Sequence, residues 1–213
     1  MSNATFSHDG VSLELPLVPA TQGNNGYDIT RLLGATGDTT LDVGFANTAS
    51  CRSAITFIDG DAGILRYRGY PIEQLAEKSS FLDVSYLVLH GELPNTAQLA
   101  EFSGNIAKYH LIDERLREMF RTMPRKSHPM PVLAAAINAL STFAVSRHGD
   151  DAYDLDRATY TLMGSVPTLA AYGYKNSVGQ PFLYPDDSLT YIENFLRMSF
   201  GLPSGPYPFD ESI

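Results

Sequence analysis

Apolar residues recur at helical spacing from Pro71 onward. In the segment IEQLAEK, Ile72, Leu75 and Ala76 fall on one helical face, and Pro71 stands where a first turn tolerates proline. The next segment, FLDVSYLVLH, carries apolar residues on several faces and is followed by Gly91, which predicts a short helix buried nearly all round. The same spacing predicts further helices over residues 96–109, 113–123, 132–144, 154–174 and 189–200.

Polar residues and prolines mark the ends and bends of these helices. Asp113 and Ser127 are candidate caps, because their side-chain oxygens can accept a hydrogen bond from the first turn of the helix that follows. Pro129 and Pro131 fit the first turn of the next helix, and Pro167 predicts a kink where it removes one hydrogen bond. The arginines of the helix over 113–123 are expected on its solvent side: Arg115, Arg117 and Arg121.

Residues 1–70 lack this spacing and predict a small, irregular β region. The segment VSLELPLV alternates apolar and polar residues up to Pro16, as an edge strand does. Residues 55–68 have β-branched and aromatic residues on both sides of the cluster DGDAG, which predicts a hairpin. Between them, LLGATGDTT has turn residues and no helical period.

The cluster DGDAG raises the question of a metal site. A calcium loop that starts at Asp59 requires an oxygen ligand, a glycine and a glutamate at positions where this chain has Gly63, Ile64 and Tyr70. Asp59 and Asp61 alone cannot supply the roughly six to eight oxygens that calcium takes. We therefore interpret the cluster as turn chemistry, because aspartate and glycine both tolerate left-handed backbone angles.

Composition and charge narrow the classes of protein. The chain has 213 residues, of which 44% are apolar, enough for a substantial core. Fifteen basic and twenty-four acidic side chains give a net charge of −9, which argues against nucleic acid or an anionic membrane as a partner. The single cysteine, Cys51, allows no internal disulfide, and no apolar run reaches the ~18 residues of a membrane span. Because the amino terminus also lacks the pattern of a signal peptide, we expect a soluble cytoplasmic protein.

Small residues gather on two of the predicted helices. They let helix backbones approach closely, either inside one chain or between two copies of it. Charged residues make up 18% of the chain, below the usual quarter or so, which favours a covered surface and hence a dimer. The residues concerned are Ala134, Ala135, Ala136, Ala139, Gly164, Ala170, Ala171 and Gly173.

Five histidines and one cysteine are the candidates for chemistry. His8 lies in a terminus expected to be mobile, and His148 lies in the polar loop SRHGDD. His90 and His128 stand at helix ends where an imidazole caps backbone groups, and His110 lies in a helix connection without an evident partner nearby in the sequence. Cys51 has no partner pattern, so we expect a buried or inert thiol. The chain also lacks a nucleophile elbow, a phosphate loop and a dinucleotide fingerprint.

Five segments together resemble the amino-terminal half of citrate synthase, in the longer bacterial form that carries a small β region before its helical body. They follow the family order over residues 48–201, and collinear matching of this length is more specific than a short motif. The segments are TASCRSAITFIDGDAGILRYRGYPIEQLA, SYLVLHGELP, SHPMPVLAAAINALSTF, VPTLAAYGYKNSVGQPFLYP and YIENFLRMSFG.

The resemblance implies an activity for the intact protein: condensation of acetyl-CoA with oxaloacetate to citrate and CoA, the first step of the tricarboxylic acid cycle. This chemistry needs a carboxylate base, a histidine that stabilises the enolate, and arginines that hold the dicarboxylate, and it needs no metal or cofactor. In the family these groups lie in the second half, where two of the histidines stand in His-Gly-Gly and His-Ala-Asp-His stretches that this chain lacks. We therefore assign no catalytic, cofactor-binding or metal-binding residue and expect a fragment that is inactive alone.

The expected fold is mainly α. Residues 71–213 are expected to form part of the large helical domain of citrate synthase, after the small β region of residues 1–70. The resemblance further implies a homodimer through helices near Val132–Ala144 and Thr159–Tyr174, antiparallel to their twins, and an assembly of dimers into hexamers in the longer bacterial group. The alternatives are a 2-methylcitrate synthase, which uses propionyl-CoA but usually lacks the β region, and a stand-alone helical dimerisation module.

Overall fold

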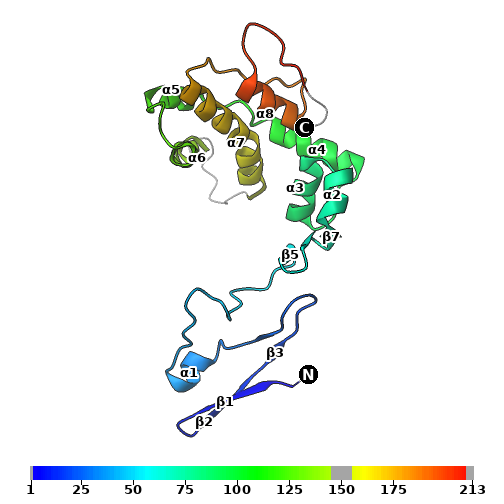
Figure 1. The fold of residues 1–213 in the computed structure, drawn as a ribbon, viewed down its shortest axis with the longest axis vertical. Coiled ribbons are helices and arrows are strands. Elements are labelled where there is room, and N and C mark those ends of the chain that lie inside the picture. Colours follow the sequence, from blue (N-terminus) through cyan, green and yellow to red (C-terminus); the bar gives the residue numbers. More distant parts are fainter. Residues whose placement is uncertain (1, 145–154, 210–213) are drawn as a thin grey trace. The chain divides into compact units, whose positions relative to one another are not determined.

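The computed structural model describes residues 2–144 and 155–209, which form two compact units. One unit consists of residues 1–80 and 87–93, and the other of residues 81–86 and 94–213. Within the described residues there are eight helices and seven short strands, so the expected mainly α fold is confirmed (Figure 1). The predicted residues His148 and Asp154 lie outside the described ranges.

The first unit contains three small antiparallel sheets. β1 pairs with β2 through a turn at Asp9 and Gly10, both of which have positive φ. β3 pairs with β4, and β5, β6 and β7 form a three-stranded sheet in that order. The strands are β1 (Ala4–His8), β2 (Val11–Leu15), β3 (Leu17–Val18), β4 (Gly26–Tyr27), β5 (Thr56–Asp59), β6 (Ile64–Tyr67) and β7 (Tyr70–Pro71).

The hairpin expected over residues 55–68 is present as β5 and β6. Asp59 pairs with Ile64 across the turn, and the Asp59 carboxylate accepts a hydrogen bond from the Ala62 amide at 3.0 Å. Gly63 has a φ of 67°, a left-handed value that glycine reaches without strain. The aspartate therefore stabilises the turn itself, in agreement with the structural interpretation of DGDAG.

One expectation for the first unit was wrong, and another was wrong in part. Helix α1 (Leu32–Thr36) forms where the sequence has no helical period, because Gly37 ends it in a left-handed conformation and Leu32 is buried. His8 is the last residue of β1 and pairs with Val11, and its expected mobility stays a prediction. Cys51 is exposed, so the expectation of a buried thiol is wrong, and its inertness stays a prediction.

The helices lie close to where the spacing placed them. Asn95 and Thr190 begin two of them with capping boxes, and Asp113 caps a third as predicted. The helices are α2 (Ile72–Lys78), α3 (Phe81–His90), α4 (Thr96–Ala107), α5 (Glu114–Thr122), α6 (Pro129–Ala144), α7 (Leu155–Val178) and α8 (Tyr191–Phe200).

Two details of these helices differ from the expectation. Helix α3 is not buried nearly all round, because Phe81 is 53% and Leu89 46% exposed in this chain. Arg117 is not on the solvent side, since its side chain is only 20% exposed and contacts Glu114 and Tyr184. A run of apolar residues does not by itself predict how many faces of a helix are buried against other elements.

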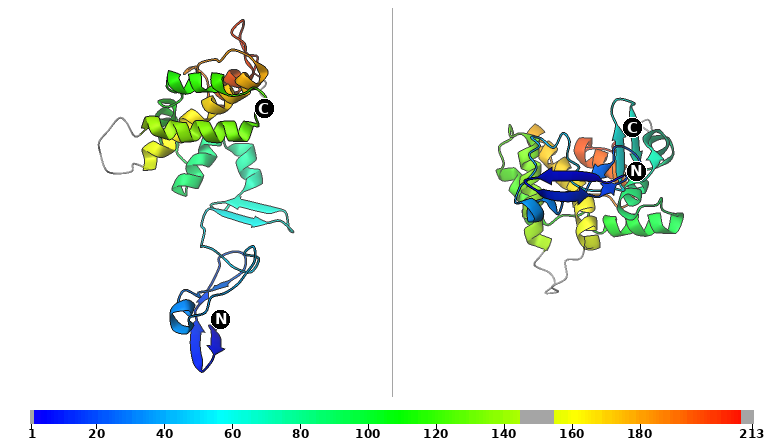
Figure 2. Two further views of the ribbon diagram at one scale, coloured as in Figure 1. Left: turned by 90° about the vertical axis from the view of Figure 1, so that its left-hand side faces the viewer. Right: turned by 90° about the horizontal axis from the view of Figure 1, so that it is seen from below.

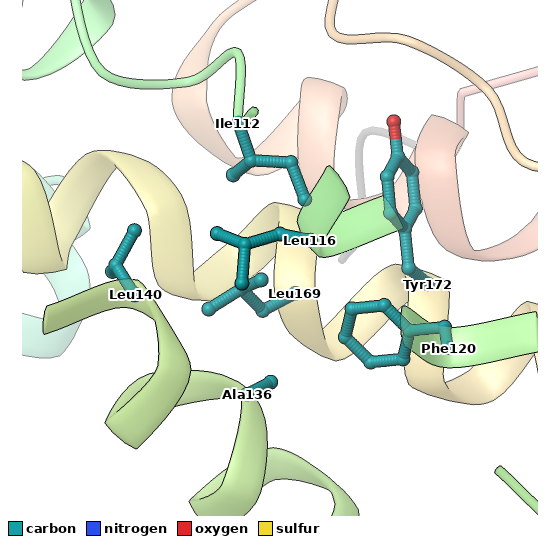
Figure 3. Packing of buried hydrophobic residues seen from close by; sticks show 7 residues of the cluster. All are labelled: Ile112, Leu116, Phe120, Ala136, Leu140, Leu169 and Tyr172. Carbon is teal, nitrogen blue, oxygen red and sulfur yellow. The ribbon is translucent and has the colours of Figure 1, made fainter. Parts of the chain in front are cut away.

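Helix α7 is the central element of the helical unit. It contacts α4, α5, α6 and α8, and Figures 1 and 2 show α6 and α8 beside it. One side of α7 contributes Leu169 and Tyr172 to an apolar core with α5 and α6, in which Phe120 and Ala136 are fully buried (Figure 3). Burial of each large side chain here stabilises the fold by about 1.5–3 kcal/mol.

The small residues of α6 and α7 divide between different neighbours. Ala136 and Ala171 are fully buried within this chain, whereas Ala134 and Ala135 are exposed. Gly164 faces the end of α4, because a Cβ there would lie 2.5 Å from the Ile106 carbonyl oxygen. Some of these residues therefore serve intramolecular packing and others remain on the surface of the chain.

Candidate functional site

The described histidines belong to different strands, helices and loops. His128 Nδ1 accepts a hydrogen bond from the Met130 amide at 3.2 Å, so the expected capping role is confirmed for this residue. His8 lies 3.5 Å from Asp9 and 3.7 Å from Asp38 in an exposed setting, and His90 is the last residue of α3. Across residues 2–144 and 155–209, no three histidine, cysteine, aspartate or glutamate side chains gather as a metal site would require.

His110 lies at a polar junction where α7 meets the end of α4 and the start of α8. Its carbonyl accepts a hydrogen bond from the Thr168 hydroxyl at 2.8 Å, and its ring centroid lies 6.0 Å from that of Tyr191. Its Nδ1 atom is buried without a hydrogen-bond partner in the described structure. Burial lowers the pKa of His110 from its ordinary value, against a weaker opposing effect of Asp187.

Pro167 explains why Tyr191 points into this junction. Proline has no amide hydrogen, so the carbonyl of Met163, four residues earlier, loses its helical donor. The Tyr191 hydroxyl donates to that carbonyl at 2.8 Å. Burial raises the pKa of Tyr191 to about 12, so the hydroxyl stays protonated and able to donate near neutral pH. The Ser165 hydroxyl extends the junction by donating to the Tyr109 carbonyl at 3.0 Å.

Lys175 is fully buried near the end of α7. Its ammonium group donates to the side-chain oxygen of Gln180 at 2.8 Å and to the carbonyl of Gly201, which follows α8. Burial lowers the pKa of this lysine, because the charged form loses its hydration. Lys175 therefore ties the ends of α7 and α8 together.

A cavity of about 450 Å³ lies between the end of α5 and the end of α7. Arg121 and Arg125 contribute the two charged groups of its lining. Gly179 has a φ of 70°, and a Cβ there would lie 2.9 Å from an Arg125 guanidinium nitrogen. The remaining lining residues are Met123, Asn176, Gln180, Pro181 and Phe182.

A second, apolar groove of about 290 Å³ runs between the start of α6 and the later half of α7. Met130 and Leu133 line it from α6, and Ala170, Gly173 and Tyr174 line it from α7. Met130 is 62% and Tyr174 43% exposed. The groove thus brings part of the small-residue surface together with large apolar side chains.

The sequence pattern indicated Ala170 and Gly173, which line the apolar groove, but it did not identify Lys175, Arg125 or Gln180. Nothing in the spacing of Lys175 distinguishes it from a surface lysine, and Arg125 and Gln180 occur in loops. The one available signal was Pro167, whose missing amide predicts an unpaired carbonyl at Met163 and hence a donor from elsewhere.

Comparison with known proteins identifies the family. Residues 44–212 match the family described as citrate synthase, C-terminal domain. The chain belongs to the citrate synthase family. It is 52% identical to citrate synthase 1 of Mycobacterium tuberculosis over 99% of this chain and 49% of the relative, and 45% identical to citrate synthase of Corynebacterium glutamicum over 98% and 48%. The chain therefore spans about half the length of the curated citrate synthases that it matches.

Solved citrate synthase structures share the fold. The enzyme of Thermotoga maritima aligns with a TM-score of 0.65 at 31% identity, over 76% of this chain and 42% of that one. The enzyme of Pyrobaculum aerophilum gives 0.64 at 34%, over 77% and 43%. That of Thermoplasma acidophilum, a ternary complex with carboxymethyl coenzyme A and oxaloacetate, gives 0.69 at 26%, over 76% and 43%.

Proposed function

We propose that this chain forms the helical scaffold of a citrate synthase, and that the intact protein condenses acetyl-CoA with oxaloacetate to give citrate and CoA. The observation that carries the proposal is the 52% identity to a citrate synthase across 99% of the chain. The chain spans about half of that relative, and the resemblance assigns the reacting groups to the other half. The base, the enolate-stabilising histidine and the substrate arginines are thus expected outside these 213 residues.

The activity is tested by following release of the CoA thiol from acetyl-CoA in the presence of oxaloacetate. We expect turnover by the intact gene product and none by the 213-residue chain alone. Turnover by the isolated chain would refute the assignment of the catalytic groups to the other half. Inactivity of the intact product with oxaloacetate would refute the function itself.

Two further measurements test the choice of acyl-CoA and the absence of a metal requirement. Propionyl-CoA in place of acetyl-CoA distinguishes a citrate synthase from a 2-methylcitrate synthase, and we expect the higher kcat/KM with acetyl-CoA. Dialysis against a metal chelator is expected to leave the rate unchanged, because the proposed chemistry uses protein groups alone. The proposal also includes a cytoplasmic location, and no described helix is both long and apolar enough to cross a membrane.

We propose further that α6 and α7 form a homodimer interface in the intact protein. The apolar groove between them and the exposed Met130, Ala134 and Tyr174 support this surface, because close helix packing needs both small residues and apolar area.

Analytical ultracentrifugation of the intact protein tests the dimer and any higher assembly. The variant Met130→Asp is expected to dissociate it, since it buries an unpaired carboxylate in an apolar contact. Leu111→Asp makes the same chemical change at another exposed site, 64% exposed and outside α6 and α7, and is expected to leave the assembly intact. Equal effects of both variants, or of neither, would contradict the proposed interface.

A further inference from the structure

Positive charge is concentrated along α5 and the loop after it. Five of the fifteen basic residues lie within residues 115–126, in a chain whose net charge is −9. They are Arg115, Arg117, Arg121, Arg125 and Lys126. A local cluster of cations in an acidic protein attracts anions to one place on its surface.

The pairing of these cations differs along the cluster. Arg115 is held by Asp113 at 2.9 Å, and Arg117 by Glu114 at 2.7 Å. Arg121 lies 3.3 Å from Glu118, which also approaches Arg117, so it is neutralised only in part. Arg125 has no carboxylate within ion-pairing distance in the portion of the chain that the structure describes. The least neutralised arginines are thus the two that line the cavity.

Both arginines stand near helix carboxyl ends, where cations also serve to compensate backbone carbonyls. Two of these carbonyls already have donors. The Asn176 side chain donates to the Met123 carbonyl at 3.3 Å, and the Gln180 backbone amide donates to the Lys175 carbonyl at 2.9 Å. These two carbonyls therefore do not require Arg125 as a donor.

The side-chain amide of Gln180 has a defined orientation. Lys175 carries only donors, so Gln180 must present its oxygen to the ammonium group, which leaves its NH₂ group available as a donor. Gln180 lines the same cavity as the two guanidinium groups. The cavity thus combines two planar guanidinium groups with a side-chain amide, a donor set suited to a phosphate group, which offers several acceptor oxygens.

We propose that the cavity between α5 and α7 binds phosphate, either as inorganic phosphate or as the phosphate group of a small metabolite, through Arg121 and Arg125. Gly179 is part of the site, because any larger residue would displace the Arg125 guanidinium group.

Isothermal titration of the intact protein at constant ionic strength tests the proposal, with inorganic phosphate and glycerol phosphate as probes. Arg125→Gln and Arg121→Gln are each expected to weaken binding about tenfold or more, because each removes charge-assisted hydrogen bonds. Lys126→Gln is the matched control: it changes net charge equally, is exposed, and does not line the cavity. It is expected to change affinity less than about twofold.

The outcomes separate the alternatives. The site is supported if the substitutions at Arg121 and Arg125 weaken binding of either probe and Lys126→Gln does not. Tighter binding of inorganic phosphate indicates the free ion as the ligand, and tighter binding of glycerol phosphate indicates a phosphate ester. Absence of binding by both probes, or equal weakening by Lys126→Gln, overturns it. The circular dichroism spectrum of each variant verifies folding. Because titration requires no turnover, the result is independent of the citrate synthase assay.

Discussion

Helix α7 packs through two kinds of surface, one apolar and one polar. Toward α5 and α6 it presents Leu169 and Tyr172, which pack by shape against buried apolar side chains (Figure 3). Toward the end of α4 and toward α8 it presents Ser165, Thr168 and Lys175, which donate to backbone carbonyls. The apolar surface needs volume, whereas the polar surface needs particular atoms in particular places.

The largest expected effect is a difference in the free energy of unfolding between two substitutions, one on each surface of α7, that nearly conserve the shape of the side chain. Lys175→Met keeps the chain length but leaves the Gly201 carbonyl and the Gln180 oxygen without their donor, and is expected to destabilise the protein by about 3 kcal/mol. Leu169→Met conserves volume on the apolar side and is expected to cost less than about 1.5 kcal/mol. Urea unfolding measures both. Equal costs would erase the distinction between the two surfaces.

The next effect concerns close approach of backbones. Gly164→Ala places a methyl group 2.5 Å from the Ile106 carbonyl oxygen and is expected to destabilise the fold by about 2 kcal/mol. Gly104→Ala is the matched control in α4, where a Cβ meets nothing within 4 Å, and is expected to stabilise by about 0.5–1 kcal/mol. In thermal unfolding, Gly164→Ala should lower the midpoint temperature and Gly104→Ala should raise it. Shifts of the same sign would contradict the prediction.

A smaller effect tests the role of Pro167. Tyr191→Phe removes the hydroxyl that donates to the Met163 carbonyl and is expected to cost about 1 kcal/mol. In the double variant Pro167→Ala/Tyr191→Phe the helix regains its own donor, so the cost of the tyrosine change should become smaller. An unchanged cost in a double-mutant cycle would show that the two residues act independently.

The smallest effect is a dependence of stability on pH. Because burial lowers the pKa of His110, the unfolded chain binds a proton more readily than the folded one below the ordinary value of 6.5. The contribution of His110 is therefore fully present above that value and is lost as the pH falls through the lowered pKa. Thermal midpoints across this range should fall less steeply in His110→Gln than in the parent protein. An equal slope in the variant and in the parent protein would contradict this contribution.

Local rules predicted much of the fold and little of the polar chemistry. The cap at Asp113, the turn at Asp59 and the helices from Ile72 onward depend on neighbours within a few residues, so spacing was sufficient to find them. Helix α1 was not predicted because its five residues are too few to show a period, and the helix packs against β2, outside its own segment.

The candidate sites depend on residues far apart in the sequence. Arg125 meets Gly179, and Tyr191 meets Met163, only after the helices have packed. The spacing of residues along the chain contains no information on such pairs. It therefore predicts that Arg117 lies in solvent, and it does not predict that Lys175 is buried.

The helical body, the hairpin and the family could be predicted from the amino-acid sequence, because they follow from short-range preferences and from collinear similarity. The burial of particular polar groups, and the partners that satisfy them, could be seen only in the folded chain. Removing a lysine, a histidine or a carbonyl from water requires a partner at hydrogen-bond distance, and packing brings that partner there from a distant part of the sequence.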